Sequence, residues 1–146
     1  MRAVVQRVGA TKLTVDGKTV AEIPHGLTVY LGVGKGDGEE QAQKTAKKIA
    51  ALRIFSDAAG KMNLSVGDVG GEILLVSQFT LYGDCRHGNR PSFTEAEEPV
   101  AADRLYERTA ELLRGHGLTV KTGVFGADMH IEQTNEGPVT ILLEFS

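Results

Sequence analysis

The feature that most constrains the fold of this chain is an unbroken apolar run at residues 73–76, Ile-Leu-Leu-Val. A strand buried on both faces has such a run, whereas a strand with one exposed face alternates. The run passes directly into Ser77, Gln78 and Thr80, and the chain then turns at Gly83-Asp84. Polar side chains at the exit of a core strand are a common way to build a reaction site. The alternative is a buried strand whose last polar side chains form only structural hydrogen bonds with neighbouring backbone groups.

The first third of the chain predicts an antiparallel sheet. Asp16-Gly17 is a strong hairpin signal between two stretches that alternate polar and apolar residues, 11–15 and 19–23. Residues 2–8 alternate imperfectly as another strand. Residues 27–33 are rich in apolar and β-branched residues, which favours a central strand. Together these stretches indicate a β meander.

Two segments carry the periodicity of amphipathic helices. In the first, Asp37 can cap the helix with Glu40 three residues later, and the helix is expected to run to about Leu52. In the second, Pro99 fits the first helical position, where its missing N–H is not needed. The expected buried positions are Ala42, Ala46, Ile49 and Leu52 in the first helix, and Ala102, Leu105, Tyr106, Thr109, Leu112 and Leu113 in the second.

The remaining segments predict further short strands, and the whole pattern sets the fold class. These strands are expected at 53–55, 118–123, 130–134 and 139–145. A turn is expected at 135–138, before the last of them. Two main helices among many strands joined in hairpins indicate an α+β fold. We predict a single domain over residues 1–146, built on a curved, mostly antiparallel, barrel-like sheet.

Composition limits where the protein acts and what it binds through charge. No segment approaches the ~20 apolar residues that a membrane span needs, and no signal peptide is recognisable. The single Cys85 cannot form an internal disulfide, which suits a reducing compartment. A formal net charge of −3 argues against a protein that coats nucleic acid, but a local basic patch can still grip one end of an RNA. We expect a cytoplasmic protein that binds no membrane.

No side-chain constellation for metal or nucleophilic catalysis stands out. The four histidines have no partner four residues away and no Cys-x-x-Cys is present, so neither a metal nor a cofactor is expected. Thr80 could act as a nucleophile, but the local sequence offers no base to activate it. Backbone N–H groups around Phe79 and Thr80 could instead form an oxyanion hole. The residues alone leave both mechanisms open.

Two motifs make the chain resemble a known family. Residues 77–81 (Ser-Gln-Phe-Thr-Leu) and 135–140 (Asn-Glu-Gly-Pro-Val-Thr) are similar to the two signature motifs of the D-aminoacyl-tRNA deacylases. The resemblance extends along the chain, through residues 1–8, 52–55, 61–64, 90–93 and 125–129.

The resemblance implies a homodimeric, cytoplasmic editing enzyme without a metal or cofactor. The family hydrolyses the ester between a D-amino acid and the terminal adenosine of tRNA, removes glycine from mischarged tRNA and rejects L-aminoacyl-tRNA. It relies on the substrate's own 2′-hydroxyl and on protein backbone. By this likeness the Gly137-Pro138 peptide is cis and reaches into the partner's active site. There its carbonyls hold the amino group and exclude an L side chain.

The same likeness assigns roles to individual residues. The catalytic positions are Ser77, Gln78, Phe79 and Thr80. Substrate binding and chiral rejection are assigned to Gly137, Pro138, Val139, Thr140 and Met129. RNA binding is assigned to Arg86 and Arg90. Gly83, Cys85 and His87 depart from the family pattern and bear on the details of contact with the RNA end.

Two other functions stay open on the residues themselves. A non-catalytic RNA-binding module would use Arg86, Arg90 and Phe93 on phosphates and bases. A metal-free acyl hydrolase would act on a small ester through Thr80. Release of amino acid from D-tyrosyl-tRNA, with the L-form untouched, distinguishes all three functions.

Overall fold

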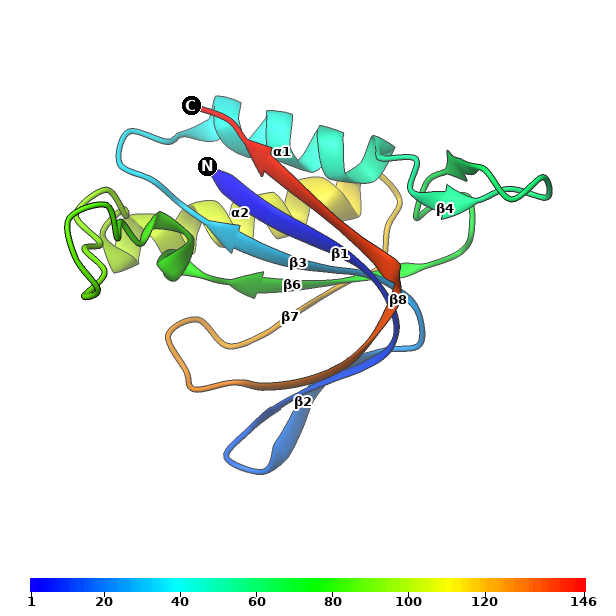
Figure 1. Cartoon of the computed structure of the whole chain (residues 1–146), viewed down its shortest axis with the longest axis horizontal. Helices are drawn as coiled ribbons and strands as arrows, with labels where there is room; N and C mark the ends of the chain where they lie inside the picture. The colour runs from blue at the N-terminus through cyan, green and yellow to red at the C-terminus, as the bar shows by residue number, and fades with distance from the viewer.

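The computed structural model describes residues 1–146 as a strongly curved sheet with two α-helices on one face (Figure 1). The helices are α1 (Glu39–Ala51) and α2 (Pro99–Gly115). The sheet strands are β1 (Arg2–Val15), β2 (Lys18–Ile23), β3 (Gly26–Gly32), β6 (Glu72–Ser77), β7 (Val120–Thr122) and β8 (His130–Glu144). The short strands β4 (Phe55–Ser56) and β5 (Met62–Leu64) form a separate hairpin. This architecture confirms the predicted α+β class with two main helices.

The sheet combines antiparallel and parallel pairings. Its order is β2-β1-β3-β6-β7, and β8 also pairs with β1. β1 is antiparallel to β2, β3 and β8, whereas β6 is parallel to both β3 and β7. Parallel neighbours need a long crossover, and α1 and α2 supply the two crossovers. The run at residues 73–76 is accordingly buried on both faces, with each side chain at most 1% exposed, as its composition predicts.

The long strands β1 and β8 each replace two shorter strands that the sequence predicts. The turn predicted at 135–138 is wrong, because the chain does not reverse there. Instead, the β1–β8 pairing jumps from Gln6 with Thr140 to Val8 with Asn135. Two steps along β1 therefore match five steps along β8, and the surplus residues of β8 form a bulge. Glycine and proline are typical of bulges as well as turns, so their presence alone does not separate the two.

The helix ends agree with the sequence at α2 and differ from it at α1. Pro99 is the first residue of α2, as predicted. At α1 the cap is Gly38, whose N–H donates to Gln41 Oε1 at 2.8 Å. Asp37 instead accepts a hydrogen bond from the Gly34 N–H at 2.7 Å and pairs with the Met1 amino group at 2.6 Å. Neither helix is long and apolar enough to cross a membrane.

Two hydrophobic clusters hold β6 from opposite faces. The larger cluster lies between the sheet and the helices and includes Leu75 and Tyr106. The Tyr106 hydroxyl donates to the Leu75 carbonyl oxygen at 2.7 Å, which ties α2 to β6. The smaller cluster fills the curl of the sheet and includes Leu74, Val76 and Leu13. Packing on both faces fixes the position at which β6 ends.

Candidate active site at the end of strand β6

The chain leaves β6 in a single turn of 3-10 helix, η1 (Phe79–Tyr82). Ser77 is the last strand residue, and the Gln78 N–H still donates to the Leu31 carbonyl oxygen at 2.8 Å. Within the turn, the Leu81 N–H donates to the Gln78 carbonyl oxygen at 3.3 Å. The predicted polar exit of the buried strand is therefore a tight turn, rather than a longer strand.

The backbone amides of Phe79 and Thr80 have no acceptor within this turn. Its hydrogen bonds begin with the N–H of Leu81, and the first N–H groups of any helix lack an internal partner. Successive free N–H groups at the start of a helical turn form a site for an anion or for a developing oxyanion. Two donors on adjacent residues, at the end of a rigid strand, can therefore stabilise a tetrahedral intermediate.

The Thr80 side chain is held by an amide and not by a base. The Gln78 side-chain Nε2 donates to Thr80 Oγ1, and Thr80 is exposed. No His, Asp or Glu side chain hydrogen-bonds to this hydroxyl. Across the molecule, no three His, Cys, Asp or Glu side chains gather as metal ligands would. The geometry therefore favours the backbone amides over Thr80 as the main chemical groups.

An apolar cavity of about 460 Å³ opens beside the turn. Three aromatic residues line it, namely Phe79, Phe93 and Phe125, and its polar lining residues are Ser77, Glu97 and Glu98. The Phe79 and Phe93 rings meet edge to face, with centroids 5.0 Å apart, and the Phe79 side chain is 55% exposed. Aromatic rings in an open cavity are suited to stacking a nucleobase. Sequence reasoning missed Phe125 as a lining residue, because it lies about fifty residues further along the chain.

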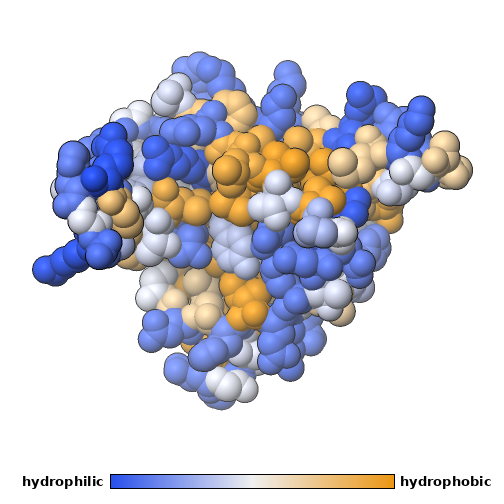
Figure 2. Space-filling view, in the orientation of Figure 1, coloured by the Kyte–Doolittle hydropathy of each residue, from blue (hydrophilic) through white to orange (hydrophobic).

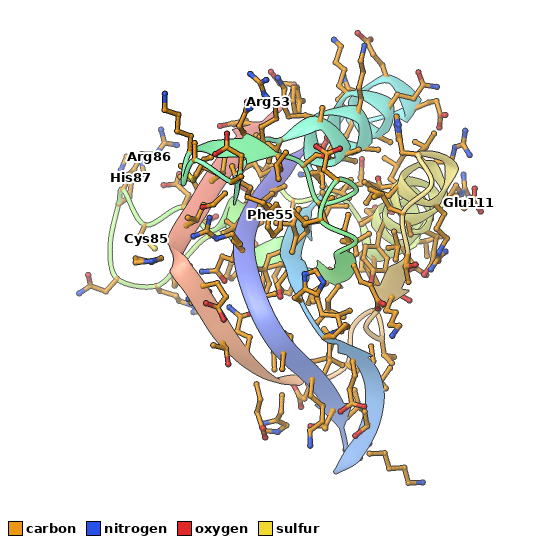
Figure 3. All side chains as sticks on the ribbon, turned by 90° about the vertical axis from the view of Figure 1, so that its right-hand side faces the viewer. Arg53, Phe55, Cys85, Arg86, His87 and Glu111 are labelled. Carbon is orange, nitrogen blue, oxygen red and sulfur yellow. The ribbon has the colours of Figure 1, made fainter.

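The basic loop next to the cavity is closed by a pair of backbone hydrogen bonds. Asp84 and Ser92 exchange N–H···O bonds of 2.8 and 2.9 Å. The Arg86 guanidinium donates two hydrogen bonds to the Asp84 carboxylate, which lowers the pKa of Asp84 to about 2. Arg86 remains 81% exposed, and Arg90 is also exposed. Figure 3 shows the segment with Cys85, Arg86 and His87 projecting from one side of the molecule.

Tyr82 anchors the far end of η1. Burial raises the pKa of its hydroxyl to about 12, and the nearby Asp37 carboxylate contributes in the same direction. The Arg2 guanidinium lies over the Tyr82 ring at 4.5 Å from its centroid and donates to the Leu81 carbonyl oxygen at 3.1 Å. The turn is thus fixed at both ends, by β6 and by the contacts of Tyr82.

The second motif forms the bulge in β8, here named the Gly-Pro bulge (residues 136–139). The Gly137-Pro138 peptide is cis, as the resemblance implies. Gly137 has a φ of +143°, which L side chains rarely adopt. Arg7 holds this segment, since its Nε donates to the Glu136 carbonyl oxygen and its Nη1 to the Ile54 carbonyl oxygen, both at 2.8 Å. The one sequence signal for this contact was an arginine next to the apolar residue Val8 in the first predicted strand.

The two motifs do not meet within one chain. Thr140, at the end of the Gly-Pro bulge, pairs with Gln6, which pairs with Thr28, which in turn pairs with Leu74. Two strands and several residues thus separate the bulge from the end of β6. Met129 also lies apart from the cavity, because it packs against Gly123 and the smaller hydrophobic cluster. The η1 turn and the Gly-Pro bulge are therefore separate features within one chain.

The chain is similar to known proteins over its whole length. A family model described as D-Tyr-tRNA(Tyr) deacylase matches residues 4–144. A protein named D-aminoacyl-tRNA deacylase from Thermotoga petrophila is 60% identical over 146 residues, which are 100% of this chain and 98% of that protein. A protein of the same name from Myxococcus xanthus is 59% identical over 144 residues, which are 99% of this chain and 94% of that protein.

Solved structures share the fold. One described as "c-Myc DNA Unwinding Element Binding Protein" has a TM-score of 0.93 and 41% identity, and the match covers 100% of this chain and 99% of that chain. Another, of a probable eukaryotic D-amino acid tRNA deacylase, has a TM-score of 0.83 at 18% identity and covers 97% of both chains. At that lower identity the likeness concerns the fold alone.

Proposed function

This chain belongs to the D-Tyr-tRNA(Tyr) deacylase family, and we propose that the backbone amides of Phe79 and Thr80 form its reaction centre. The enzyme is an editing hydrolase that cleaves the ester bond of D-aminoacyl-tRNA to a free D-amino acid and tRNA, and it rejects L-aminoacyl-tRNA. Its substrate partner is therefore tRNA. Membership of a family of enzymes also makes a non-catalytic RNA-binding module the weaker alternative.

Hydrolysis of the ester depends more on donors that stabilise the negative carbonyl oxygen during attack than on a side-chain nucleophile. A water oxygen bonds to the ester carbonyl carbon, the bond to the ribose oxygen breaks, and a proton from the water ends on that oxygen. During attack the carbonyl oxygen becomes negative, and the N–H groups of Phe79 and Thr80 donate to it. One such donor typically contributes ~10²–10³-fold to the rate. The substrate's 2′-hydroxyl lies beside the ester and transfers the proton, while Ser77 and Gln78 orient the turn and its ligand.

The apolar cavity beside the turn takes the terminal adenine. A purine fits a cavity of about 460 Å³, and Phe79, Phe93 and Phe125 offer ring faces and edges on which it packs. Base stacking on an aromatic side chain is worth ~1–3 kcal/mol per base. An adenine in this cavity leaves the ribose and its ester near Ser77 and the two free amides, because all of these groups lie at the same end of β6.

A homodimer brings η1 of one subunit and the Gly-Pro bulge of the other together as the two halves of one active site. Within one chain the Gly-Pro bulge is far from η1, which supports delivery of the bulge from a second subunit. Figure 2 shows an apolar area over β1 and β8, where Leu142 is 75% exposed beside Val4 and Leu81. An exposed leucine within an apolar patch is typical of a subunit interface. An isologous dimer through this face places one bulge at each of two active sites.

The Gly-Pro bulge then selects the hand of the amino acid. Backbone carbonyls of Gly137 and Pro138 hold the amino group, and Thr140 continues the surface that faces the substrate. Val139 and Met129 support the surrounding sheet, because they pack against the two hydrophobic clusters on its opposite faces. A rigid backbone surface excludes an L side chain by steric conflict and accepts any D side chain that points to solvent. Glycine has no side chain, and a site cannot readily exclude a substrate smaller than the one it accepts. Glycyl-tRNA is therefore a second substrate.

The phosphates next to the terminal adenosine run along the basic loop. Arg86 and Arg90 are its exposed positive charges, and the chain that follows them reaches Phe93, which lines the cavity. Two hydrogen bonds to the Asp84 carboxylate hold the Arg86 guanidinium, so it is fixed in place rather than mobile. Contacts of this kind position an RNA without reading its sequence.

The observation that carries this proposal is the pair of free amides at the end of β6, next to an aromatic cavity. The test is release of free amino acid from D-tyrosyl-tRNA, L-tyrosyl-tRNA and glycyl-tRNA by the purified protein. We expect rapid release from the D-form, measurable release from the glycyl form and almost none from the L-form. Equal release from the D- and L-forms would contradict the proposed selection of hand.

A further inference from the structure

A chain of polar side chains inside the curl of the sheet links both ends of the Gly-Pro bulge to β1 and β3. The Tyr30 hydroxyl donates to Gln133 Oε1 at 3.3 Å. Gln133 Nε2 donates to Gln6 Oε1 at 2.8 Å and to Asn135 Oδ1 at 3.3 Å. Gln6 Nε2 in turn donates to Thr140 Oγ1 at 3.3 Å. Asn135 and Thr140 are the residues that flank the bulge, so each end of it is held by a glutamine amide.

The bulge needs such contacts because β1 does not pair with it. The ladder between β1 and β8 is interrupted between the pairs Gln6–Thr140 and Val8–Asn135. On the opposite face of β1, Arg7 already holds the Glu136 carbonyl oxygen. Successive residues of a strand point to opposite faces, so Gln6 and Arg7 grip the two sides of the same segment.

We propose that Gln6 and Gln133 are positioning residues that set the place of the Gly-Pro bulge and thereby the discrimination between D- and L-aminoacyl groups. This inference rests on the proposed function of the bulge. Neither glutamine needs to touch the substrate. Their effect is to keep the carbonyls of Gly137 and Pro138 at a fixed distance from the amides of η1 across the dimer.

The direction of the hydrogen bonds makes the arrangement selective for glutamine. Gln133 accepts from Tyr30 through its oxygen, which turns its NH₂ group toward Gln6 and Asn135. Gln6 then accepts through its own oxygen and turns its NH₂ group toward Thr140. Burial raises the pKa of Tyr30, so its hydroxyl stays protonated and can only be lost as a donor at high pH. A side chain that can only donate or only accept hydrogen bonds cannot replace either amide.

The test compares Gln6→Ala and Gln133→Ala with Gln43→Ala as a matched control. Gln43 lies on α1, and its amide donates only to the Glu39 carboxylate on the surface. The readout is the ratio of L-alanyl-tRNA to D-alanyl-tRNA hydrolysis, with sedimentation to verify the dimer. Losing one such hydrogen bond is expected to raise this ratio about threefold to tenfold in each test variant. The control is expected to keep the wild-type ratio.

The double variant gives a further check. Because the two glutamines act through one hydrogen bond to each other, their effects on the ratio are expected to be less than multiplicative. Tyr30→Phe keeps the ring and removes only the bond that orients Gln133, so it serves if an alanine variant does not fold. It is expected to raise the ratio about twofold.

Gly137→Ala, measured in the same assay, separates the positioning role of the glutamines from the proposal that the Gly-Pro bulge selects the hand of the amino acid. If Gly137→Ala changes the ratio while the glutamine variants and Tyr30→Phe match the control, the positioning role is refuted and the bulge keeps its function. If Gly137→Ala also leaves the ratio unchanged, the bulge does not select the hand, and both proposals fall together.

Discussion

Replacing Gly137 by alanine tests the role of the Gly-Pro bulge at its most constrained residue. The Gly137 φ of +143° lies in a region that is open almost only to glycine. A Cβ at this position would lie 2.8 Å from the Val139 nitrogen and 2.9 Å from both Arg7 Nη2 and Val139 Cγ2. Two of these neighbours are backbone or a short branched side chain, so they cannot simply move aside.

The size of the effect follows from these two costs. Backbone strain contributes about 1–3 kcal/mol and overpacking about 1–3 kcal/mol more, which together amount to about 2–6 kcal/mol, or ~30-fold and upward in the population of the native bulge. The bulge can relieve this cost by shifting, because it has no ladder partner in β1. We therefore expect a loss of D-tyrosyl-tRNA hydrolysis of ~30-fold or more, with a smaller change in thermal stability.

Gly60→Ala is the control, because Gly60 also has a positive φ, of +80°, but a Cβ there meets nothing within 4 Å. The assays are single-turnover release of amino acid from D-tyrosyl-tRNA, thermal unfolding and sedimentation. Gly60→Ala is expected to retain wild-type activity. If Gly137→Ala is folded, dimeric and as active as Gly60→Ala, the reasoning about the bulge is refuted.

Three further outcomes follow from the site. Thr80→Val should lower single-turnover deacylation less than about tenfold, whereas loss of a true nucleophile costs about a millionfold and would restore Thr80 to that role. Arg86→Ala and Arg90→Ala should each raise KM and reduce the slope of log affinity against log salt by about 0.7–0.9; an unchanged slope would place the phosphates elsewhere. Tyr82 has a pKa raised from about 10 to about 12, so its contribution to stability is complete below pH 10 and is lost as pH rises through 12. Denaturant titrations between pH 9 and 12 should show a smaller loss of unfolding free energy in Tyr82→Phe than in the wild type. Equal losses in the two proteins would contradict this.

The end of the buried strand β6 could be predicted from sequence because its cause is local. The apolar run at 73–76 specifies a buried strand, and the polar residues after it mark the end of that strand. The parallel pairing of β6 with β3 and β7 was not predicted, because it depends on how α1 and α2 cross the sheet. The single turn η1 also escaped prediction, since it forms only once the Gln78 N–H has ended the ladder with Leu31.

The Gly-Pro bulge depends on interactions that no local pattern records. Gly137 and Pro138 indicate a turn on local grounds, and only the family resemblance gave them a function. Arg7 and Gln6 support the bulge from 129 and 134 residues away in sequence, and they do so through side chains on opposite faces of β1. A glutamine or an arginine within a strand gives no sign of its partner until the register of that strand is known.

The most direct test of the central claim is a hybrid dimer, because the claim is that each active site combines η1 of one subunit with the Gly-Pro bulge of the other. Phe79→Pro removes one amide donor. Proline is tolerated there because Phe79 is the first residue of η1 and because the preceding Gln78, with a φ of −144° and a ψ of 80°, is not helical. Phe79→Ala controls for loss of the ring alone. Alone, Phe79→Pro should lose about 10²–10³-fold in activity, and Gly137→Ala ~30-fold or more. When they are reassorted in equal amounts, about a quarter of wild-type activity should return, since half of the dimers are hybrids with one intact site. Failure to regain activity in verified hybrids would contradict a site shared between subunits.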